Sequence, residues 1–442
     1  MKKIVLLSVV ASSMIMAGGD IKPVEPVVEG PAPVVVEESM GTVSGQLRAF
    51  YINRAFSGSK TNTRSSMTVG GWLGYDTAAW NGLSAGVKFY ALEGFKLHSG
   101  PYVAATYDPS LYGAGFDEYG FIGEAYLNYK AGNTNLKVGR QKLNTPLAGA
   151  DDARMLPNLF EAAVLSNTDI ADTTLILAHV TKETVGTFGN VYGKGSQLSL
   201  QSGYGLGFQT ATSGQFKDMG VVALGEGANT NGVTAVAAMY NGIENLKLQG
   251  WDYYAHDILN AVYLQADYKV SAIKLSAQYI NESETGKALA GNVDSNYWAV
   301  KAGTNFGDLS GYVAYSQTGK STGTVTNGGI LTPWGGMPAF TQGMVTRHQF
   351  FADTATTKGA VTYNFSNITG LNLKATGYYV SFNVGSANTY KPGKAWTATE
   401  AGFDIKYQAT KALNLRVRAN FPTDFAPGLD WAEYRFIANY SF

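Results

Sequence analysis

The 442-residue chain contains no cysteine. Disulfides, zinc sites with thiolate ligands and cysteine nucleophiles are therefore excluded. Charged residues make up only 15% of the chain, whereas an average soluble protein has roughly 25%. Lysine plus arginine equals aspartate plus glutamate, at 33 each. Because no net charge is available to attract a polyanion, we expect no nucleic-acid partner.

Long apolar runs are also missing after the N-terminal region. Beyond Gly41 no stretch reaches the roughly 18 consecutive apolar residues of a membrane helix. If the chain enters a membrane, it must do so with strands closed into a barrel. Glycine (53), tyrosine (27) and phenylalanine (21) are plentiful, which favours many strands joined by tight turns.

The N-terminus has the layout of a secretory signal peptide. Lys2 and Lys3 precede an apolar run from Ile4, and small residues follow around Ala17. The apolar run is shorter than the roughly 20 residues that span a bilayer. We therefore predict a cleaved signal peptide at 1–17, a Pro/Val/Glu-rich N-terminal tail at 18–41, and a transmembrane β-barrel at 42–442.

Period-two alternation recurs along the third segment. In "LNLRVRANF" (413–421) apolar residues alternate with Asn414, Arg416, Arg418 and Asn420, as expected for a strand with two different faces. The stretches 121–130, 272–280, 401–408 and 433–442 behave alike. Aromatic residues gather near the predicted strand ends, as in an interfacial girdle, at Phe121, Tyr129, Tyr407, Phe421, Tyr440 and Phe442. A secreted soluble sandwich or propeller would also alternate, but the girdle favours lipid.

Short and long connections alternate as well. The short turns lie at 131–135, 306–308, 366–370 and 409–412, and the long polar segments at 56–65, 95–117, 144–171, 283–295, 319–354, 383–396 and 422–430. This rhythm predicts an all-β fold, a transmembrane antiparallel β-barrel of about 18 strands (16 possible) with both termini in the periplasm. We expect the seventh strand between 186 and 225, where glycine and serine leave the register weakly specified.

Several blocks resemble the OprD-type family of outer-membrane porins over nearly the whole chain after Gly41. The blocks are "LRAFYINRAF" (47–56), "LKVGRQKLNTPLAGADDARMLPNLFEAAVLSNTDI" (136–170), "WDYYAHDILNAVYLQADY" (251–268), "GLNLKATGYY" (370–379) and "AEYRFIANYSF" (432–442). The resemblance implies an eighteen-stranded barrel in the outer membrane of a Gram-negative bacterium, with an inward-folded third extracellular loop and passive uptake of small charged solutes. Phe442 resembles the signal that the barrel assembly machinery reads. The Pro-rich tail and the modest number of arginines depart from the family pattern.

Barrel closure should bring the first and last strands together and place arginines from three adjacent strands on one inner wall. The predicted pore-lining residues are Arg48, Arg416, Arg418, Arg435, Asp404, Lys406 and Glu433. Arginine stays protonated and its planar fork binds carboxylates, so such a column would guide anions, as the family resemblance also implies. Alternatively each arginine is solvated or pairs with Glu433 or Asp404.

The segment 144–171 follows the fifth predicted strand, from which the resemblance implies that a constriction loop folds inward. Its candidate residues are Asp151, Asp152, Arg154, Glu161 and Asp169. Acidic groups opposite a basic wall would create a transverse field that orients small carboxylates. An ordinary surface loop with solvated charges is the alternative.

The function predicted is a porin for passive, partly selective diffusion of small hydrophilic solutes, namely carboxylate-bearing nutrients, amino acids or ions. The alternative is a structural or adhesive barrel with a plugged lumen. No local motif of nucleophile, glycine and base occurs, so we expect no enzyme, no catalytic residue, no metal and no cofactor. The expected partners are outer-membrane lipid and lipopolysaccharide, the barrel assembly machinery and small solutes. Both a monomer and a homotrimer are compatible with the sequence.

Overall fold

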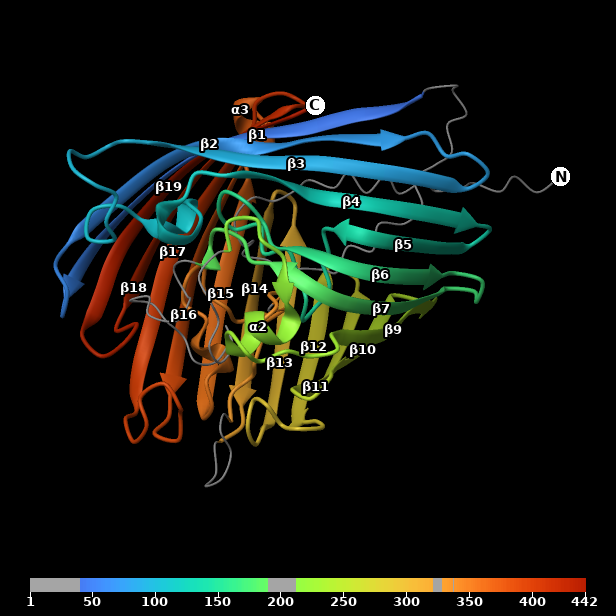
Figure 1. Cartoon of the computed structure of the whole chain (residues 1–442). Coiled ribbons are helices and arrows are strands. Elements are labelled where there is room, and N and C mark those ends of the chain that lie inside the picture. Colours follow the sequence, from blue (N-terminus) through green and yellow to red (C-terminus); the bar gives the residue numbers. More distant parts are fainter. Residues whose placement is uncertain (1–39, 190–211, 321–327, 337) are drawn as a thin grey trace.

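The computed structural model describes residues 40–189, 212–320, 328–336 and 338–442, and their strands form one antiparallel sheet that closes on itself (Figure 1). The strands are β1 (Gly41–Gly58), β2 (Thr63–Thr77), β3 (Leu83–Phe95), β4 (Gly120–Ala131), β5 (Thr134–Gln141), β6 (Leu159–Asn167), β7 (Thr173–Thr184), β8 (Lys217–Asp218), β9 (Val233–Ile243), β10 (Leu246–Ala255), β11 (Leu259–Val270), β12 (Ile273–Glu284), β13 (Asp294–Phe306), β14 (Leu309–Thr318), β15 (Thr354–Asn364), β16 (Leu373–Val384), β17 (Trp396–Gln408), β18 (Leu413–Thr423) and β19 (Leu429–Ser441). The two-residue β8 pairs with β7 alone, whereas β7 also pairs with β9. Over the described residues the barrel therefore has eighteen strands, which confirms the predicted fold class.

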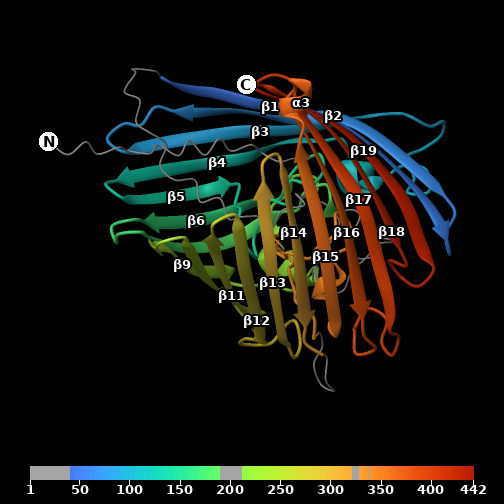
Figure 2. The ribbon, with the colours of Figure 1, turned by 180° about the vertical axis from the view of Figure 1, so that it is seen from behind.

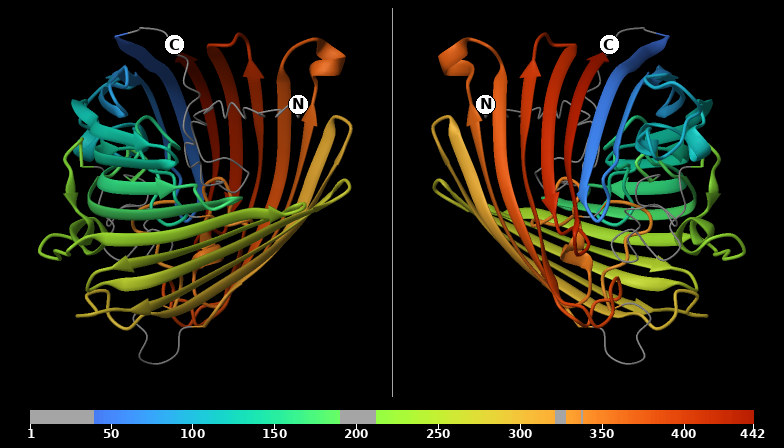
Figure 3. Two further views of the ribbon diagram at one scale, coloured as in Figure 1. Left: turned by 90° about the vertical axis from the view of Figure 1, so that its right-hand side faces the viewer. Right: turned by 90° about the vertical axis from the view of Figure 1, so that its left-hand side faces the viewer.

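The barrel is closed by a long ladder between β1 and β19. The ladder runs from Gln46 opposite Ser441 to Gly58 opposite Leu429. Two hydrogen bonds between the backbones of Gly45 and Phe442, of 2.9 and 3.1 Å, extend it to the last residue. Figures 2 and 3 show the resulting wall from behind and from its two sides.

The outer face carries the apolar side chains, as in a protein whose solvent is lipid. In β19 the outward side chains of Tyr434, Phe436 and Tyr440 are 40%, 50% and 46% exposed, whereas Glu433 and Arg435 point inward and are fully buried. A soluble sheet would do the reverse, because there the apolar face covers the core. Among the described residues, no helix is long and apolar enough to span a membrane.

Two positional predictions were wrong. β6 lies inside the segment 144–171 that we expected to be one loop, and the seventh strand is β7, which precedes 186–225. The described part of 186–225 holds β8 and the short helix α2 (Met219–Leu224), while 190–211 lie outside the described residues. β6 was missed because its inner face is apolar as well: Phe160 and Ala162 are buried inside the barrel while Leu165 is exposed outside.

Three inner segments occupy the barrel. L2 (96–119) contains the 3-10 helices η1 (Pro109–Leu111) and η2 (Ala114–Phe116), and L3 is 142–158. L7 comprises the described residues 328–336 and 338–353 between β14 and β15, with η3 (His348–Phe350) near its end. The remaining helix, α3 (Ser366–Thr369), lies at the same end of the barrel as the C-terminus (Figure 3). The predicted signal peptide and most of the predicted tail, within 1–39, fall outside the described residues.

Candidate functional site: an arginine wall and two inner loops

Inward-facing arginines gather where β1, β2, β18 and β19 meet. Their inward direction follows from the alternation of side chains along a strand. In β18, Arg416 and Arg418 are 3% and 0% exposed, whereas Leu415, the residue before Arg416, faces outward and is 38% exposed. The register places Arg418 opposite Arg435 on the neighbouring strand. Arg48 and Arg54 of β1 lie two strands from β18, across β19.

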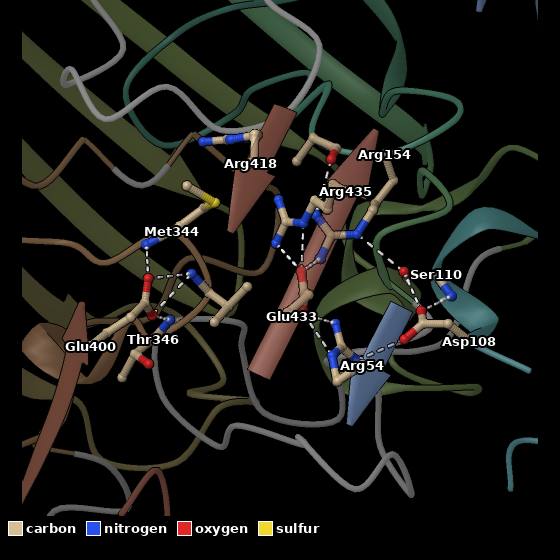
Figure 4. A network of polar contacts seen from close by, with 12 residues as sticks. Arg54, Asp108, Ser110, Arg154, Met344, Thr346, Glu400, Arg418, Glu433 and Arg435 are labelled. Carbon is tan, nitrogen blue, oxygen red and sulfur yellow. Dashed lines mark hydrogen bonds and ion pairs between the residues drawn. The ribbon is translucent and has the colours of Figure 1, made fainter. Parts of the chain in front are cut away.

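Glu433 of β19 is the centre of one group of ion pairs (Figure 4). The Arg54 Nη2 atom lies 2.6 Å from its Oε2, and the Arg154 Nη2 atom lies 3.7 Å from its Oε1. The Arg435 Nε also donates to Oε1. All of these side chains are at most 3% exposed. The interaction is therefore barely weakened by water or salt.

A second carboxylate in this group, Asp108, comes from L2. Its Oδ2 lies 2.9 Å from Arg54 Nη1 and 3.0 Å from Arg64 Nε, and its Oδ1 accepts a hydrogen bond from the Ser110 N–H at 3.0 Å. Burial alone would raise the pKa of the Asp108 carboxyl, but the charges of Arg54 and Arg64 outweigh burial and hold this pKa below its usual range. Asp108 is thus ionised and ties L2 to the wall.

A second group surrounds Asp404 of β17. Arg416 approaches it with two nitrogens: its Nε donates to Oδ1 at 2.7 Å and its Nη2 contacts Oδ2. Arg418 Nε lies 3.8 Å from Oδ1, and Lys406 Nζ lies 3.7 Å from Oδ2. Asp404 and Glu433 therefore pair with the arginines, as one of the alternatives from the sequence had it.

Cations outnumber carboxylates in this ion-pair network, which we call the arginine wall. Its ion pairs join eight cations to four carboxylates; these are Arg48, Arg54, Arg64, Arg154, Lys406, Arg416, Arg418 and Arg435 with Asp108, Asp152, Asp404 and Glu433. The side chain of Lys406 is 23% exposed, whereas the arginines of the network are almost fully buried. The wall has a positive balance that the neutral chain as a whole lacks.

Arg48 attaches L3 to this wall. Its Nη1 donates to Asp152 Oδ1 at 2.7 Å and to the Met155 carbonyl oxygen at 3.1 Å, and its Nη2 donates to Asp152 Oδ2 at 3.3 Å. The Nε atom binds Asn439 Oδ1 at 2.8 Å on β19. One guanidinium thus joins the barrel seam to the inner loop.

L3 and L7 contact each other inside the barrel. The Gly149 N–H donates to the Trp334 carbonyl oxygen at 3.0 Å, and the Gly336 N–H donates to Asp151 Oδ1 at 3.2 Å. Gly336 has φ +88°, and a Cβ on it would stand 2.1 Å from the Pro146 carbonyl oxygen, so only glycine fits. Burial raises the pKa of the Asp151 carboxyl, although Arg347, whose Nη1 lies 4.0 Å from Oδ2, opposes this.

The far end of L7 is held in an aromatic pocket. The His348 ring stacks on Phe351 with centroids 4.4 Å apart, and its Nε2 donates to the Phe425 carbonyl oxygen. Burial lowers the pKa of His348 to about 4, and the hydrogen bond to Phe425 only partly offsets this. His348 is therefore neutral at physiological pH.

The structure separates two of the predicted loop residues from the others. Asp151, Asp152 and Arg154 lie in L3, but Glu161 is on β6, where its Oε1 lies 3.0 Å from Lys182 Nζ. Asp169 lies in the β6–β7 turn and accepts hydrogen bonds from Asn133 and Asn167. Placing Glu161 and Asp169 in the constriction loop was wrong, because β6 ends the loop at residue 158.

Sequence reasoning also missed Arg54, Arg64 and Asp108. Arg54 could have been found, since it is six residues from Arg48 and therefore on the same strand face. Asp108 could not be found in this way, because a loop has no repeating pattern in its sequence from which the position of a side chain, or its partner, could be inferred. Among the described residues no group of three or more histidine, aspartate or glutamate side chains could hold a metal ion.

The model of the OprD family of outer membrane porins matches residues 36–442. The chain belongs to the OprD family. Solved structures support the fold of this porin: Pseudomonas aeruginosa OccK2 (OpdF) has a TM-score of 0.70 at 17% identity and covers 91% of this chain and 97% of its own. P. aeruginosa OpdK with vanillate has a TM-score of 0.69 at 17% identity, with coverage of 90% and 98%. P. aeruginosa OccK9 (OpdG) has a TM-score of 0.68 at 20% identity, with coverage of 91% and 98%.

No curated protein matches the porin by sequence. Family membership confirms the predicted location in the outer membrane of a Gram-negative bacterium and the predicted function as a channel for small solutes. As an outer-membrane porin the protein contacts membrane lipid through the apolar outer face described above.

Proposed function

We propose that this porin passes small solutes bearing a carboxylate, and does so by passive diffusion along the arginine wall. The observation that carries the proposal is the wall's excess of cations, eight against four carboxylates. An anion that moves past this surface meets an attractive potential, and a cation meets a barrier.

The burial of the arginines decides how they act on a solute. Arg418 and Arg435 are fully buried, so they contribute through their field more than through direct contact. A field in a low-dielectric surround is less screened than one in water. Lys406, the most exposed cation of the wall, is the group that a passing carboxylate would meet. Weak attraction spread over several groups lets a solute enter and leave quickly.

One solved structure of similar fold, OpdK, holds vanillate. Vanillate is itself a small carboxylate, which supports the proposed solute class. Carboxylate-bearing nutrients and amino acids are accordingly the solutes that we propose to test first, with inorganic anions as the reference. Of the acids predicted to face the wall from L3, only Asp151 keeps that proposed role, because Glu161 and Asp169 lie elsewhere and Asp152 pairs with Arg48 of the wall itself.

A second function, a structural or adhesive barrel with a plugged lumen, is favoured by one observation. The described residues of L7 are almost all buried, and L3 contacts L7 across the interior. If this arrangement closes the lumen completely, the protein passes no ions at any voltage.

Single-channel current in a planar bilayer separates the two functions. The refolded protein is placed in a KCl gradient and the reversal potential is read. Discrete conductance steps, with a reversal potential shifted toward the equilibrium potential of chloride, support an anion-attracting porin. Steps with cation selectivity would contradict the role of the arginine wall, and a folded protein without any current would favour the plugged barrel.

Three further parts of the proposal concern assembly and chemistry. Phe442 is 55% exposed on the outer face of the seam, where we propose that the barrel assembly machinery binds it. We propose that the protein is a channel and not an enzyme, and that it needs no cofactor. The proposed assembly is a monomer or a homotrimer, because a lipid-facing and a subunit-facing surface are both apolar.

A further inference from the structure

L7 is attached to the barrel wall by glutamate and lysine side chains that contact its backbone. Glu282 of β12 accepts a hydrogen bond from the Leu331 N–H at 2.8 Å, and Lys358 of β15 donates to the Gln342 carbonyl oxygen at 2.5 Å. Both wall residues are at most 2% exposed. Because these hydrogen bonds are made to the backbone of L7, they fix the path of the loop and do not depend on which side chains L7 carries.

Glu400 of β17 makes the most extensive of these contacts (Figure 4). Its Oε1 accepts from the Met344 N–H at 2.6 Å and its Oε2 accepts from the Thr346 N–H at 2.7 Å. The Val345 N–H lies 3.4 and 3.2 Å from the two oxygens, and the Tyr378 hydroxyl also donates to Oε1. One carboxylate thus receives three consecutive backbone N–H groups of L7.

The local chain is shaped for this contact. The Gly343 N–H donates to the Thr346 carbonyl oxygen at 2.9 Å, which closes a tight turn, and a Cβ on Gly343 would stand 2.7 Å from Glu400 Oε2. Successive N–H groups that converge on one point form an anion-binding nest. Hydrogen bonds to an ionised acceptor are roughly twice as strong as those between neutral groups. These hydrogen bonds therefore link the position of the turn at 343–346 to the carboxylate of Glu400.

Glu400 also relates L7 to the arginine wall. Asp404, which binds Arg416, is four residues further along β17 and lies on the same inward face. Four residues along a strand correspond to roughly 13 Å. In Figure 4, Arg418 is drawn above the Glu400 group on one side and the Glu433 group on the other. The turn at 343–346 is consequently held on the same inner wall as the cations that we propose to attract solutes.

We infer that Glu400 is a positioning residue of the channel: by holding the 343–346 turn it fixes L7 at the distance from the arginine wall that sets the width of the solute path. The inference rests on the proposed function, because it assumes that solutes pass along this wall. Glu400 itself need not touch a solute. Its carboxylate is fully buried beneath the turn that it binds.

The experiment compares the native protein with Glu400→Ala and Glu400→Gln by single-channel recording and by trypsin digestion of the folded barrel. Arg347 is a trypsin site inside L7 that is only 4% exposed, so cleavage there reports release of the loop. Glutamine keeps the size of the side chain but has one acceptor oxygen, and its amide N–H groups oppose those of L7. In Glu400→Ala we expect a higher single-channel conductance and cleavage after Arg347. In Glu400→Gln we expect a smaller increase in conductance and less cleavage.

A reversible tether tests whether position is the cause. The hydroxyl oxygens of Ser316 on β14 and Thr341 in L7 are 2.6 Å apart, and the native chain has no cysteine. A Ser316→Cys, Thr341→Cys pair introduced into Glu400→Ala should therefore form a disulfide when oxidised. We expect oxidation to return the conductance to that of the same pair with Glu400 intact, and reduction to raise it again.

The outcomes separate the inference from the proposed function. Unchanged conductance together with an uncut Arg347 in Glu400→Ala would overturn the positioning role, as would a conductance that the oxidised tether does not restore. If the native protein carries no current but Glu400→Ala is cut after Arg347, the positioning of L7 stands and the channel function fails. If Glu400→Ala does not fold, Glu400→Gln with and without the oxidised tether gives the same comparison.

Discussion

Replacing Arg48 with alanine should release L3 from the barrel seam. The change removes both donors to Asp152, whose side chain is only 12% exposed, and a donor to the carbonyl oxygen of Met155. Breaking a buried ion pair by removing one partner costs about 3–5 kcal/mol. Because Asp152 keeps some contact with water, we take the lower end, about 3 kcal/mol, which raises the open fraction of L3 roughly 10²-fold.

The assay uses a single cysteine in a chain that has none. Ala153 in L3 is 4% exposed, so a maleimide reacts with Ala153→Cys only when the loop opens, and its rate reports the open fraction. Arg48→Lys keeps the charge but not the two-pronged geometry, and we expect an intermediate rate. Arg140→Ala is the matched control, since Arg140 lies 3.9 Å from Glu161 with 42% of its side chain exposed. An exposed pair of this kind is worth about 0–1 kcal/mol.

The reasoning would be refuted by a labelling rate in Arg48→Ala that matches the rate in Arg140→Ala. Such a result would mean that other contacts of L3, such as the hydrogen bond from Asn158 Nδ2 to the Gly149 carbonyl oxygen at 2.9 Å, hold the loop without Arg48.

Three other changes test separate parts of the structure. Replacing Arg416 and Arg418 together with alanine removes two cations of the wall, so we expect the reversal potential in a KCl gradient to shift toward cations; an unchanged value would exclude a role of this charge in selectivity. Gly336→Ala, in L7, would place a Cβ 2.1 Å from the Pro146 carbonyl oxygen of L3, so we expect L7 and L3 to separate and the single-channel conductance to rise. A conductance equal to that of the native protein would count against this contact as part of the constriction. Burial lowers the pKa of His348 from 6.5 to about 4. As the pH falls, the unfolded state therefore binds a proton at this histidine before the folded state does. The stability that neutral His348 provides is complete above pH 6.5 and is lost as the pH falls to 4. The melting temperature measured by circular dichroism should therefore fall more steeply over this range in the native protein than in His348→Phe, and equal slopes would contradict the assignment.

Strands with two chemically different faces could be predicted from the sequence, and those with two similar faces could not. The alternation in 413–421 and 433–442 matches β18 and β19, because one face meets lipid and the other the polar interior. β6 has apolar residues on both faces, since L3 and its neighbours cover the inner one with hydrophobic side chains. The period-two signal disappears wherever the interior of a barrel is packed like a core.

The candidate site shows the same division. The adjacency of Arg48, Arg435 and Arg418 follows from barrel closure alone and could be predicted without coordinates. The loop residues that complete the site could not be predicted, because Asp108 reaches the wall from L2 and Arg154 reaches it from L3. The inward path of L7 was likewise not predicted, since a polar segment between two strands has the same composition whether it lies outside the barrel or within it.

The β1–β19 seam constrains the order in which the protein can be made. Arg48 and its seam partner Asn439 are 391 residues apart in the chain, so the barrel cannot close before synthesis and export of the last strand are complete. Until then both end strands present unpaired backbone edges, which are prone to aggregation. Contacts this distant in sequence also form slowly. The chain must therefore be kept from self-association until β19 can pair with β1.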